Sequence, residues 1–335
     1  MTLRNLLAAN PQITDPGLIH VGDAVSIPVA YLPTLGGEGT SPQDINNRGQ
    51  IVGYSDTAAG DSHAFIWQDG TMTDLGTLDG AEWSAADAIN DLGQVVGWSD
   101  VDGDAGFLWQ DGVMTDLGMR NGLRAPWYIN NRGQIVGYSD TAAGDLDLFM
   151  WEGGALTALG MTGDLWPRDI NDRGQIVGYS DTAAGDSLAF LWENGVMTSP
   201  WPPGGRTWSS ADAINDRGQV VGSSKTTTGD LHAFLWEDGV MRDLGTLGGR
   251  GSTPTSINEM GQVVGYSDTA AGDSHAFIWQ DGTMTDLGTL GGKESYADAI
   301  NDPGQVLGRS NGHAFIWQDG VMTDLGPLGQ VRGCG

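Results

Sequence analysis

The sequence repeats itself seven times, with 40 to 44 residues between corresponding positions. Each repeat contains an Ile-Asn pair, and a Trp follows this pair at a similar distance in every copy. The Ile residues are Ile45, Ile89, Ile129, Ile170, Ile214, Ile257 and Ile300. Two stretches, residues 55–70 and 267–282, are identical and read SDTAAGDSHAFIWQDG. A period of this length indicates one supersecondary unit per repeat, and such a unit cannot bury its apolar surface alone.

Each repeat divides into four short apolar runs bounded by turn residues. In the second repeat these runs are SAADAIN, GQVVGWS, AGFLWQ and VMTDLG, and we refer to the matching strands of every repeat as a, b, c and d. Asn-x-x-Gly-Gln lies between a and b, and Asp-Gly lies between c and d, which predicts two tight reversals. Strand c is apolar at consecutive positions, as in HAFIW, which indicates a sheet covered on both faces.

Four antiparallel strands per repeat predict the blade of a β-propeller, because stacked blades cover each other and a ring leaves no large open edge. We therefore predict an all-β fold over residues 29–335, a seven-bladed β-propeller of four-stranded antiparallel blades, preceded by a short α+β remnant. The sequence pattern of strand d occurs eight times, whereas those of a, b and c occur seven times. The additional copy is YLPTLGG at 31–37, which matches DLGTLGG. Either this copy or VMTDLGPLG at 321–329 could complete the last blade, and the other could pair with a neighbouring chain.

The composition fits this fold and restricts the partners. The 54 Gly and 13 Trp among 335 residues suit many short strands joined by tight turns. A formal net charge of −28 disfavours nucleic acid and anionic membrane surfaces as partners. The one cysteine, Cys334, excludes an internal disulfide and a Cys-based zinc site. The sequence shows neither a secretory signal nor an apolar run long enough for membrane insertion.

The repeats resemble those of the extracellular HAF-repeat proteins, which are named after the tripeptide His-Ala-Phe. This tripeptide occurs four times here, at 63–65, 232–234, 275–277 and 313–315. The strings HAFxW, DGxMxDLGTLGG, AxxIN and GQVVGxS carry the resemblance over about nine tenths of the chain. The departures are AGFLW, DLFMW and SLAFLW in the second to fourth repeats, and a shortened loop, RSNG, in the seventh. The resemblance implies an extracellular or cell-surface location and says little about activity.

Residues 1–28 resemble the second half of a LysM domain, with LLAANPQI as its signature and a closing strand before Ile-Pro. LysM domains bind N-acetylglucosamine polymers such as peptidoglycan and chitin. The first strand and first helix of such a domain have no counterpart here, and half of the sugar groove is missing with them. We therefore expect the chain to begin inside a longer protein rather than to retain this binding.

The first position of the HAF tripeptide provides a test of whether its histidine is chemically active. The seven repeats carry His63, Gly106, Leu148, Leu188, His232, His275 and His313 at this position. Gly and Leu cannot replace a metal ligand or a general base. We therefore predict a packing or strand-end role for these histidines.

The loops between strands b and c are rich in aspartate. The second repeat carries Asp100, Asp102 and Asp104, an oxygen-rich Asp-x-Asp-Gly-Asp sequence that could hold calcium. The alternative is that these aspartates form local Asx-turns. Apart from this calcium site, we predict no cofactor.

Besides the Trp that every repeat carries in strand c, the sequence has six further Trp residues, and five of them precede strand a. The d–a and b–c connections leave from one end of the strands, so one face gathers long loops that carry Trp and Asp. Aromatic rings can stack on sugars while carboxylates accept hydrogen bonds from hydroxyl groups, or they can pack between blades. The predicted binding residues are Trp83, Trp127, Trp166 and Trp208.

From these features we predict a non-enzymatic, extracellular or cell-surface module that binds a ligand through its loop face, with a glycan or cell-wall polymer as partner. One alternative is a structural protein that self-associates through the surplus strand or through calcium. A second alternative is a glycan-active enzyme, although acidic pairs are too numerous for a catalytic dyad to be selected.

Overall fold

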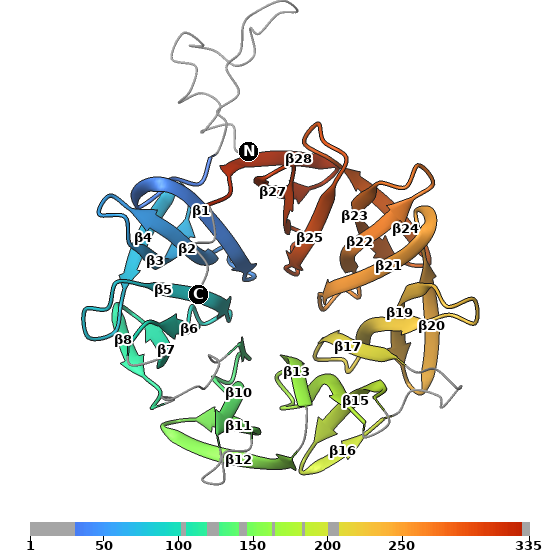
Figure 1. Cartoon of the computed structure of the whole chain (residues 1–335), viewed down its shortest axis with the longest axis horizontal. Coiled ribbons are helices and arrows are strands. Elements are labelled where there is room, and N and C mark those ends of the chain that lie inside the picture. Colours follow the sequence, from blue (N-terminus) through green and yellow to red (C-terminus); the bar gives the residue numbers. More distant parts are fainter. Residues whose placement is uncertain are drawn as a thin grey trace, which may run out of the picture.

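The computed structural model describes residues 31–101, 105–118, 127–140, 146–162, 165–182, 185–199 and 208–329. These residues form seven antiparallel sheets of four strands each, arranged as blades around a central axis (Figure 1). The predicted seven-bladed β-propeller is therefore confirmed. The LysM-like segment 1–28, Cys334, Asp102 and Asp104 lie outside the described residues.

The two strands of each blade nearest the axis are the a and b strands of the repeat. The a strands are β1 (Gly36–Ile45), β5 (Ser84–Ile89), β9 (Tyr128–Ile129), β13 (Leu165–Ile170), β17 (Ser209–Ile214), β21 (Gly248–Ile257) and β25 (Ser295–Ile300). The b strands are β2 (Ile51–Thr57), β6 (Val95–Ser99), β10 (Ile135–Asp140), β14 (Ile176–Asp181), β18 (Val220–Lys225), β22 (Val263–Thr269) and β26 (Val306–Ser310).

The c and d strands lie further from the axis, and the d strands form the outer rim of the ring (Figure 1). The c strands are β3 (Ser62–Gln68), β7 (Ala105–Gln110), β11 (Leu146–Glu152), β15 (Ser187–Glu193), β19 (Leu231–Glu237), β23 (Ser274–Gln280) and β27 (His313–Gln318). The d strands are β4 (Thr71–Gly76), β8 (Val113–Asp116), β12 (Ala155–Thr162), β16 (Val196–Thr198), β20 (Val240–Gly245), β24 (Thr283–Gly288) and β28 (Val321–Pro327).

The backbone geometry of the turn between strands c and d explains why its two central residues are Asp and Gly. Asp69 and Gly70 have φ angles of 50° and 87°, so both central residues are left-handed. A two-residue turn with this geometry matches the twist of the flanking strands, and Asp and Gly tolerate it better than other residues. The predicted tight reversal is confirmed.

Strand a carries a β-bulge two residues before the repeated Ile. In the first blade Pro42 pairs with Gly53 and Asp44 pairs with Val52, which leaves Gln43 as the extra residue. Five other blades have the same shift, with Asp87, Arg168, Asp212, Thr255 and Asp298 as the extra residues. A bulge redirects the side chains around it, and here these residues belong to the strands that surround the axis.

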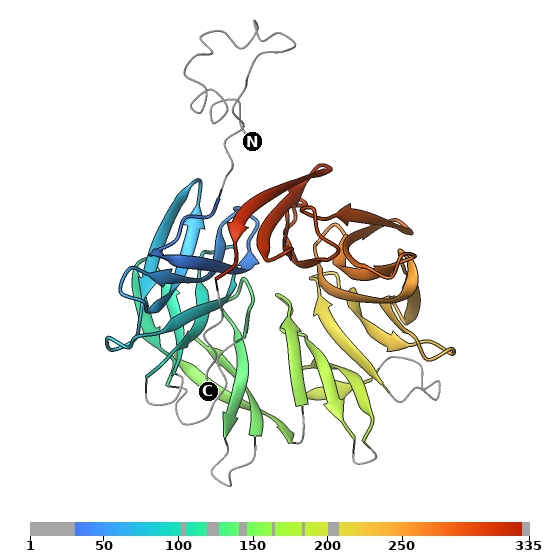
Figure 2. The ribbon, with the colours of Figure 1, turned by 45° about the horizontal axis from the view of Figure 1, so that its top comes forward.

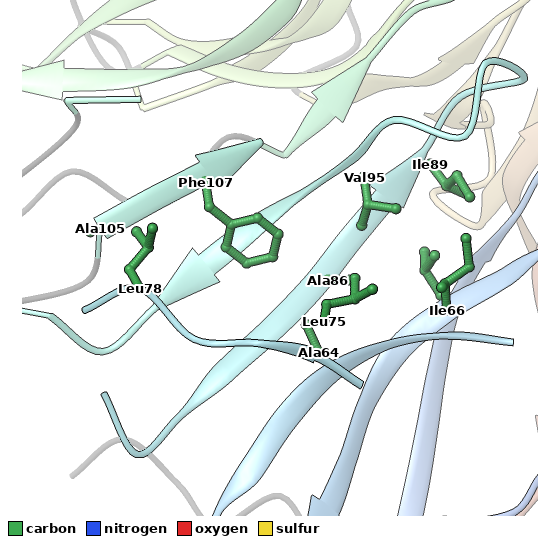
Figure 3. Close-up of a cluster of buried hydrophobic side chains, with 10 residues drawn as sticks. Ala64, Ile66, Leu75, Leu78, Ala86, Ile89, Val95, Ala105 and Phe107 are labelled. Carbon is green, nitrogen blue, oxygen red and sulfur yellow. The ribbon is translucent and has the colours of Figure 1, made fainter. Parts of the chain in front are cut away.

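Neighbouring blades are held together by apolar side chains. Between the first two blades, Ala64, Ile66 and Leu75 pack against residues of the second blade that include Val95 and Phe107 (Figure 3). Val95 and Phe107 are completely buried. The prediction that both faces of each sheet are covered is confirmed by this packing, which removes apolar surface from water on each side of a blade.

The C-terminal d strand completes the last blade. β28 pairs with β27, and the ring closes where β1 lies beside β28 (Figure 2). The surplus d-type string at 31–37 forms no strand d. Leu32 is buried and donates its N–H to the carbonyl oxygen of Leu325 at 2.7 Å, while the N–H of Leu35 donates to the Ser55 hydroxyl at 3.0 Å. This string therefore docks on the first and last blades, and in the described part of the chain it is no spare strand for self-association.

Within the described ranges there is no helix with the length and apolar character needed to cross a membrane.

Candidate functional site in the axial channel

The strands that surround the axis create a channel with two different ends. At the turn end lie the a–b turns, which follow each repeated Ile. At the loop end lie the d–a and b–c connections, because strand a enters from there and strand b returns to it. The residues at the two ends differ in regularity and in chemistry.

The turn end is closed by a ring of asparagines. The Asn after each Ile donates from its Nδ2 atom to the backbone carbonyl oxygen of the corresponding Asn in the next blade, over 2.8 to 3.1 Å. The seven members are Asn46, Asn90, Asn130, Asn171, Asn215, Asn258 and Asn301. Because the last donates to the first, this ring joins the N-terminal and C-terminal blades without an exchanged strand.

A second ring of hydrogen bonds lies one residue further on. In each blade the backbone N–H of this residue donates to a side-chain oxygen of the next blade, over 2.6 to 2.8 Å. The seven members are Asn47, Asp91, Asn131, Asp172, Asp216, Glu259 and Asp302. A cavity of about 260 Å³ lies within the two rings. Its side chains are committed to interblade contacts, so we regard this end as architecture.

On the loop side of the Ile residues, the channel contains a cavity of about 210 Å³, which we call the axial cavity. Every blade contributes to it from the two positions before the Ile, where the bulge lies. Its polar and aromatic lining comprises Gln43, Asp44, Asp87, Trp127, Tyr128, Arg168, Asp169, Asp212, Thr255, Ser256 and Asp298. Five carboxyl groups and one guanidinium group therefore face a small enclosed space.

Burial raises the pKa of the carboxyl groups in the axial cavity. It raises the pKa of Asp44 and Asp298 to about 6 and the pKa of Asp87 and Asp169 to about 7, and it also raises the pKa of Asp212. A carboxyl group with a pKa near neutrality is partly protonated, so it can donate a hydrogen bond as well as accept one. The cavity therefore offers donors and acceptors together.

Two of these carboxylates also hold blades together. Asp44 accepts hydrogen bonds from the N–H groups of Ile45 at 2.8 Å and Ile89 at 3.0 Å. Asp169 accepts equivalent bonds from Ile170 and Ile214. These bonds oppose the pKa rise caused by burial.

Asp87 differs from these two carboxylates. Its Oδ2 atom is buried and has no hydrogen-bond partner. An unpaired buried carboxyl oxygen that lines a cavity is available to a ligand that brings its own donor.

Aromatic rings from the third and fourth blades cluster beside the axial cavity. Trp127 meets Tyr128 and Tyr138 edge to face, with ring centroids 6.4 and 6.0 Å apart. Trp166 meets Tyr138 edge to face at 5.9 Å and stacks on Tyr179 at 6.2 Å. The guanidinium group of Arg168 lies 5.4 Å from the centroid of Tyr179. We call these five rings the aromatic cluster.

The structure separates the four tryptophans predicted to bind a ligand. Trp127 lines the axial cavity, and Trp166 belongs to the aromatic cluster. Trp83 instead forms a backbone β-bridge with Ser62, and Trp208 forms one with Ser187. Both serines lie at the start of strand c in the preceding blade. Trp83 and Trp208 directly precede strands β5 and β17, lie at junctions between blades and do not line the axial cavity. The four side chains therefore do not form a common site.

The predicted strand-end role of the HAF histidines agrees with their contacts. Nδ1 of each histidine lies 2.8 to 3.0 Å from a carboxylate oxygen of the Asp in the paired strand d. The pairs are His63 with Asp74, His232 with Asp243, His275 with Asp286, and His313 with Asp324. These contacts fasten strand c to strand d at the loop end of a blade.

The predicted calcium site remains a prediction. Of its three aspartates only Asp100 is described, and its N–H donates to the carbonyl oxygen of Trp83. Within the described ranges, no group of three or more His, Cys, Asp or Glu side chains is arranged to hold a metal ion. In the first blade, the N–H of Thr57 donates to the carbonyl oxygen of Asp61 at 2.8 Å, which shows the b–c loop closing on itself as a local turn.

The sequence analysis did not identify the axial cavity, although the sequence contains a signal for it. The two residues before the Ile are Asp-Ala in the second, fifth and seventh repeats and differ in the other four, as in Gln43-Asp44, Trp127-Tyr128 and Arg168-Asp169. Polar and charged side chains at the innermost strand of a propeller point to a lined channel rather than to a dry core.

No protein-family model matches the chain, and no curated protein matches it. Solved structures do match it. The propeller domain of the trilobed protease from Pyrococcus furiosus, described as having an open velcro topology, is 14% identical with a TM-score of 0.57. The match covers 76% of this chain and 82% of that one.

Two peptidases match over a larger part of this chain. The puromycin-hydrolysing peptidase of Mycobacterium tuberculosis is 11% identical with a TM-score of 0.63, over 92% of this chain and 57% of the peptidase. The acylaminoacyl peptidase of Pyrococcus horikoshii is 10% identical with a TM-score of 0.60, over 87% of this chain and 52% of the peptidase. This chain therefore spans about half the length of these two peptidases.

These comparisons correct the prediction that the chain is not an enzyme. All three structures are named as proteases or peptidases, so possession of this fold gives no reason to exclude an enzymatic activity. At 10 to 14% identity the likeness shows the fold alone. The class that fold and site define together is thus a seven-bladed β-propeller with a polar, aromatic-flanked cavity in its channel.

Proposed function

We propose that this propeller binds a glycan at the loop end of its axial channel. The observation that carries the proposal is the placement of the aromatic cluster beside a cavity in which five carboxyl groups and Arg168 converge. A sugar presents apolar C–H faces and a set of hydroxyl groups. Aromatic rings suit the faces, and partly protonated carboxyl groups suit hydroxyls that both donate and accept.

The size of the cavity limits what can enter it. A cavity of about 210 Å³ is smaller than a typical pocket for a drug-sized ligand, which is roughly 300–1,000 Å³. We therefore expect one sugar unit to occupy the axial cavity, with the rest of the glycan on the loop face. Asp87 provides the clearest polar anchor, because its Oδ2 atom has no partner within the protein.

An extracellular or cell-surface location belongs to this proposal and rests on the resemblance to the HAF-repeat proteins. A glycan or cell-wall polymer would be accessible to the loop face in that location. The net charge of −28 favours neutral glycans over polyanionic ones, since like charges repel at long range.

The proposal is tested by a glycan array followed by calorimetric titration of the strongest neutral ligand. Trp127→Ala is expected to lower the affinity about tenfold, because it removes a ring that lines the axial cavity. Trp208→Ala is the matched control, since it removes the same side chain at a blade junction away from the cavity. Equal losses in the two variants, or no binding of any glycan by the folded protein, would refute the proposal.

A further inference from the structure

The seventh blade departs from the repeat at two neighbouring positions. Strands β26 and β27 are joined directly by Asn311 and Gly312, whereas in the first blade residues 58–61 separate β2 from β3. In addition, Arg309 occupies a place that holds a tyrosine in four other blades, Trp98 in the second and Ser223 in the fifth, and it is the one charged residue among the seven. Residues that serve the architecture are repeated, so two coincident departures indicate a local function.

The shortened connection leaves a cavity of about 570 Å³. In the sixth blade residues 270–273 form the b–c loop, and next to it Asp268 of β22 accepts a hydrogen bond from the N–H of Gly251 of β21 at 3.2 Å. No such loop exists in the seventh blade. The cavity is lined by Gly292, Lys293, Glu294, Tyr296, Arg309, Ser310, Asn311, Gly312 and Leu328, and we call it the blade-seven cavity.

The blade-seven cavity combines an aromatic ring with two cations. The guanidinium group of Arg309 lies 5.3 Å from the centroid of Tyr296, and Tyr296 also meets Tyr266 edge to face at 5.1 Å. The hydroxyl of Tyr296 donates to Glu294 at 3.3 Å. Two cations on one cavity are notable because the chain has only 15 Lys and Arg residues against 43 Asp and Glu residues.

Lys293 and Arg309 can still donate hydrogen bonds to a ligand. Lys293 lies 3.6 Å from Asp273, and Arg309 lies 3.6 Å from Asp298, so neither contact is a short hydrogen bond. Burial raises the pKa of Asp298 to about 6, which weakens its hold on Arg309 in mildly acidic solution. A guanidinium group has five N–H donors in a planar fork that matches a carboxylate.

We infer that the blade-seven cavity binds a sugar carrying one carboxylate, that is, a hexuronic acid unit. The carboxylate would meet Arg309 and Lys293, the hydroxyl groups would meet Glu294 and Asn311, and the ring of Tyr296 would form an apolar wall. A single negative charge fits this chemistry, because the net charge of the whole chain repels a polyanion. The inference rests on the proposed glycan-binding function and adds a second subsite with a defined preference.

The test compares the affinity of the full chain for glucuronic and galacturonic acid with that for glucose and galactose, by calorimetry or saturation-transfer NMR. The expected result is at least about tenfold tighter binding of the acids. Two variants follow the chain's own repeats. Arg309→Tyr restores the residue of four other blades, and the second variant replaces Asn311 and Gly312 with residues 268–274 of the sixth blade, which fills the cavity.

Both variants are expected to abolish the preference for the acids and to leave binding of neutral sugars unchanged. Trp127→Ala is expected to show the opposite pattern. Thermal melts establish that each variant is folded, and Arg309→Tyr serves if the loop replacement does not fold. Glucose 6-phosphate and glucose 6-sulfate identify the anion, since equal binding of these compounds would overturn the assignment to a carboxylate.

The outcomes separate this inference from the proposed function. If neutral and acidic sugars bind equally, or if the preference survives both variants, the uronic acid subsite is refuted while glycan binding in the axial cavity stands. If neither kind of sugar binds to the folded chain, both proposals fail.

Discussion

At the turn end of the axial channel the same residue, Asn, follows the Ile in all seven blades, whereas towards the loop end the two residues before the Ile are Asp-Ala in three blades and differ in the other four. Each Asn makes a hydrogen bond to the next blade, so substitution in one repeat would break the ring. Among the residues of the axial cavity, Asp44, Asp169 and Thr255 make hydrogen bonds to the next blade. The repeated Asn therefore serves the contacts between blades, and the residues before the Ile that differ between blades are the ones that can give the channel a preference for a ligand.

The largest effect is expected from a glycine of strand b that permits the bulge of strand a. A Cβ atom on Gly265 would lie 2.1 Å from the carbonyl oxygen of Thr253, and neither backbone can move far in a packed sheet. Gly265→Ala should lower the free energy of unfolding by about 4 kcal/mol, measured by urea denaturation. Gly251→Ala is the control, because its φ is not left-handed and the nearest atom to its Cβ position, the carbonyl oxygen of Leu231, lies 3.3 Å away. A loss no greater than that of the control would contradict the close approach.

The next largest effect concerns the asparagine ring. Asn171 donates to Asn215 and Gln175 and accepts from the N–H groups of Arg173 and Gln175. Asn171→Ala should cost about 3 kcal/mol of unfolding free energy, since these groups are buried and lose their partners. Asn131→Ala, in the exposed second ring, should cost less than about 1 kcal/mol. Equal costs in the two rings would remove the distinction between them.

At the loop end, removal of a charge should stabilise the protein. Burial raises the pKa of Asp87 to about 7, so folding favours its protonated form. That contribution is fully present below about pH 4, where the unfolded chain is also protonated, and is lost as the pH rises towards 7. Asp87→Asn should therefore match the wild type at pH 4 and exceed its unfolding free energy by about 2 kcal/mol at pH 8, after allowance for solvent access.

The matched control for Asp87 is Asp281→Asn, the same substitution on an exposed c–d turn. Thermal melts of both variants between pH 4 and pH 8 would make the comparison. A pH-independent effect of Asp87→Asn would show that its carboxyl group is ionised in the folded protein and would contradict the described environment.

The smallest effect is expected from the HAF histidines. His275 pairs with Asp286 at 2.8 Å, but the Asp side chain is 42% exposed, and such surface pairs contribute little. His275→Leu, which copies the residue of the third and fourth repeats, should change the free energy of unfolding by less than about 1 kcal/mol. Asp286→Ala should cost more, because Asp286 also accepts from the N–H of Gly288. A loss of several kcal/mol in His275→Leu would point to a role beyond the strand end.

Much of the fold could be predicted because its causes are local and repeated. The Asp-Gly turns, the continuous apolar c strands and the period of 40 to 44 residues are all visible in the sequence, and each has one structural solution. The site could be predicted less well. Trp83 and Trp127 both follow strand d, but Trp127 stands directly before Tyr128-Ile129 whereas Trp83 stands at the start of WSAADAI, and only Trp127 reaches the axial cavity.

The sequence by itself determined the number of blades, the order of strands within each blade and the face that carries the long connections. Only the tertiary structure decided which strand completes the last blade, which side chains meet across the axis, and that a missing loop opens a cavity beside Arg309. The physical reason is distance along the chain. Turns and alternation act over a few residues, whereas Asp44 and Asp298, or Asn46 and Asn301, come together only after seven blades have closed a ring.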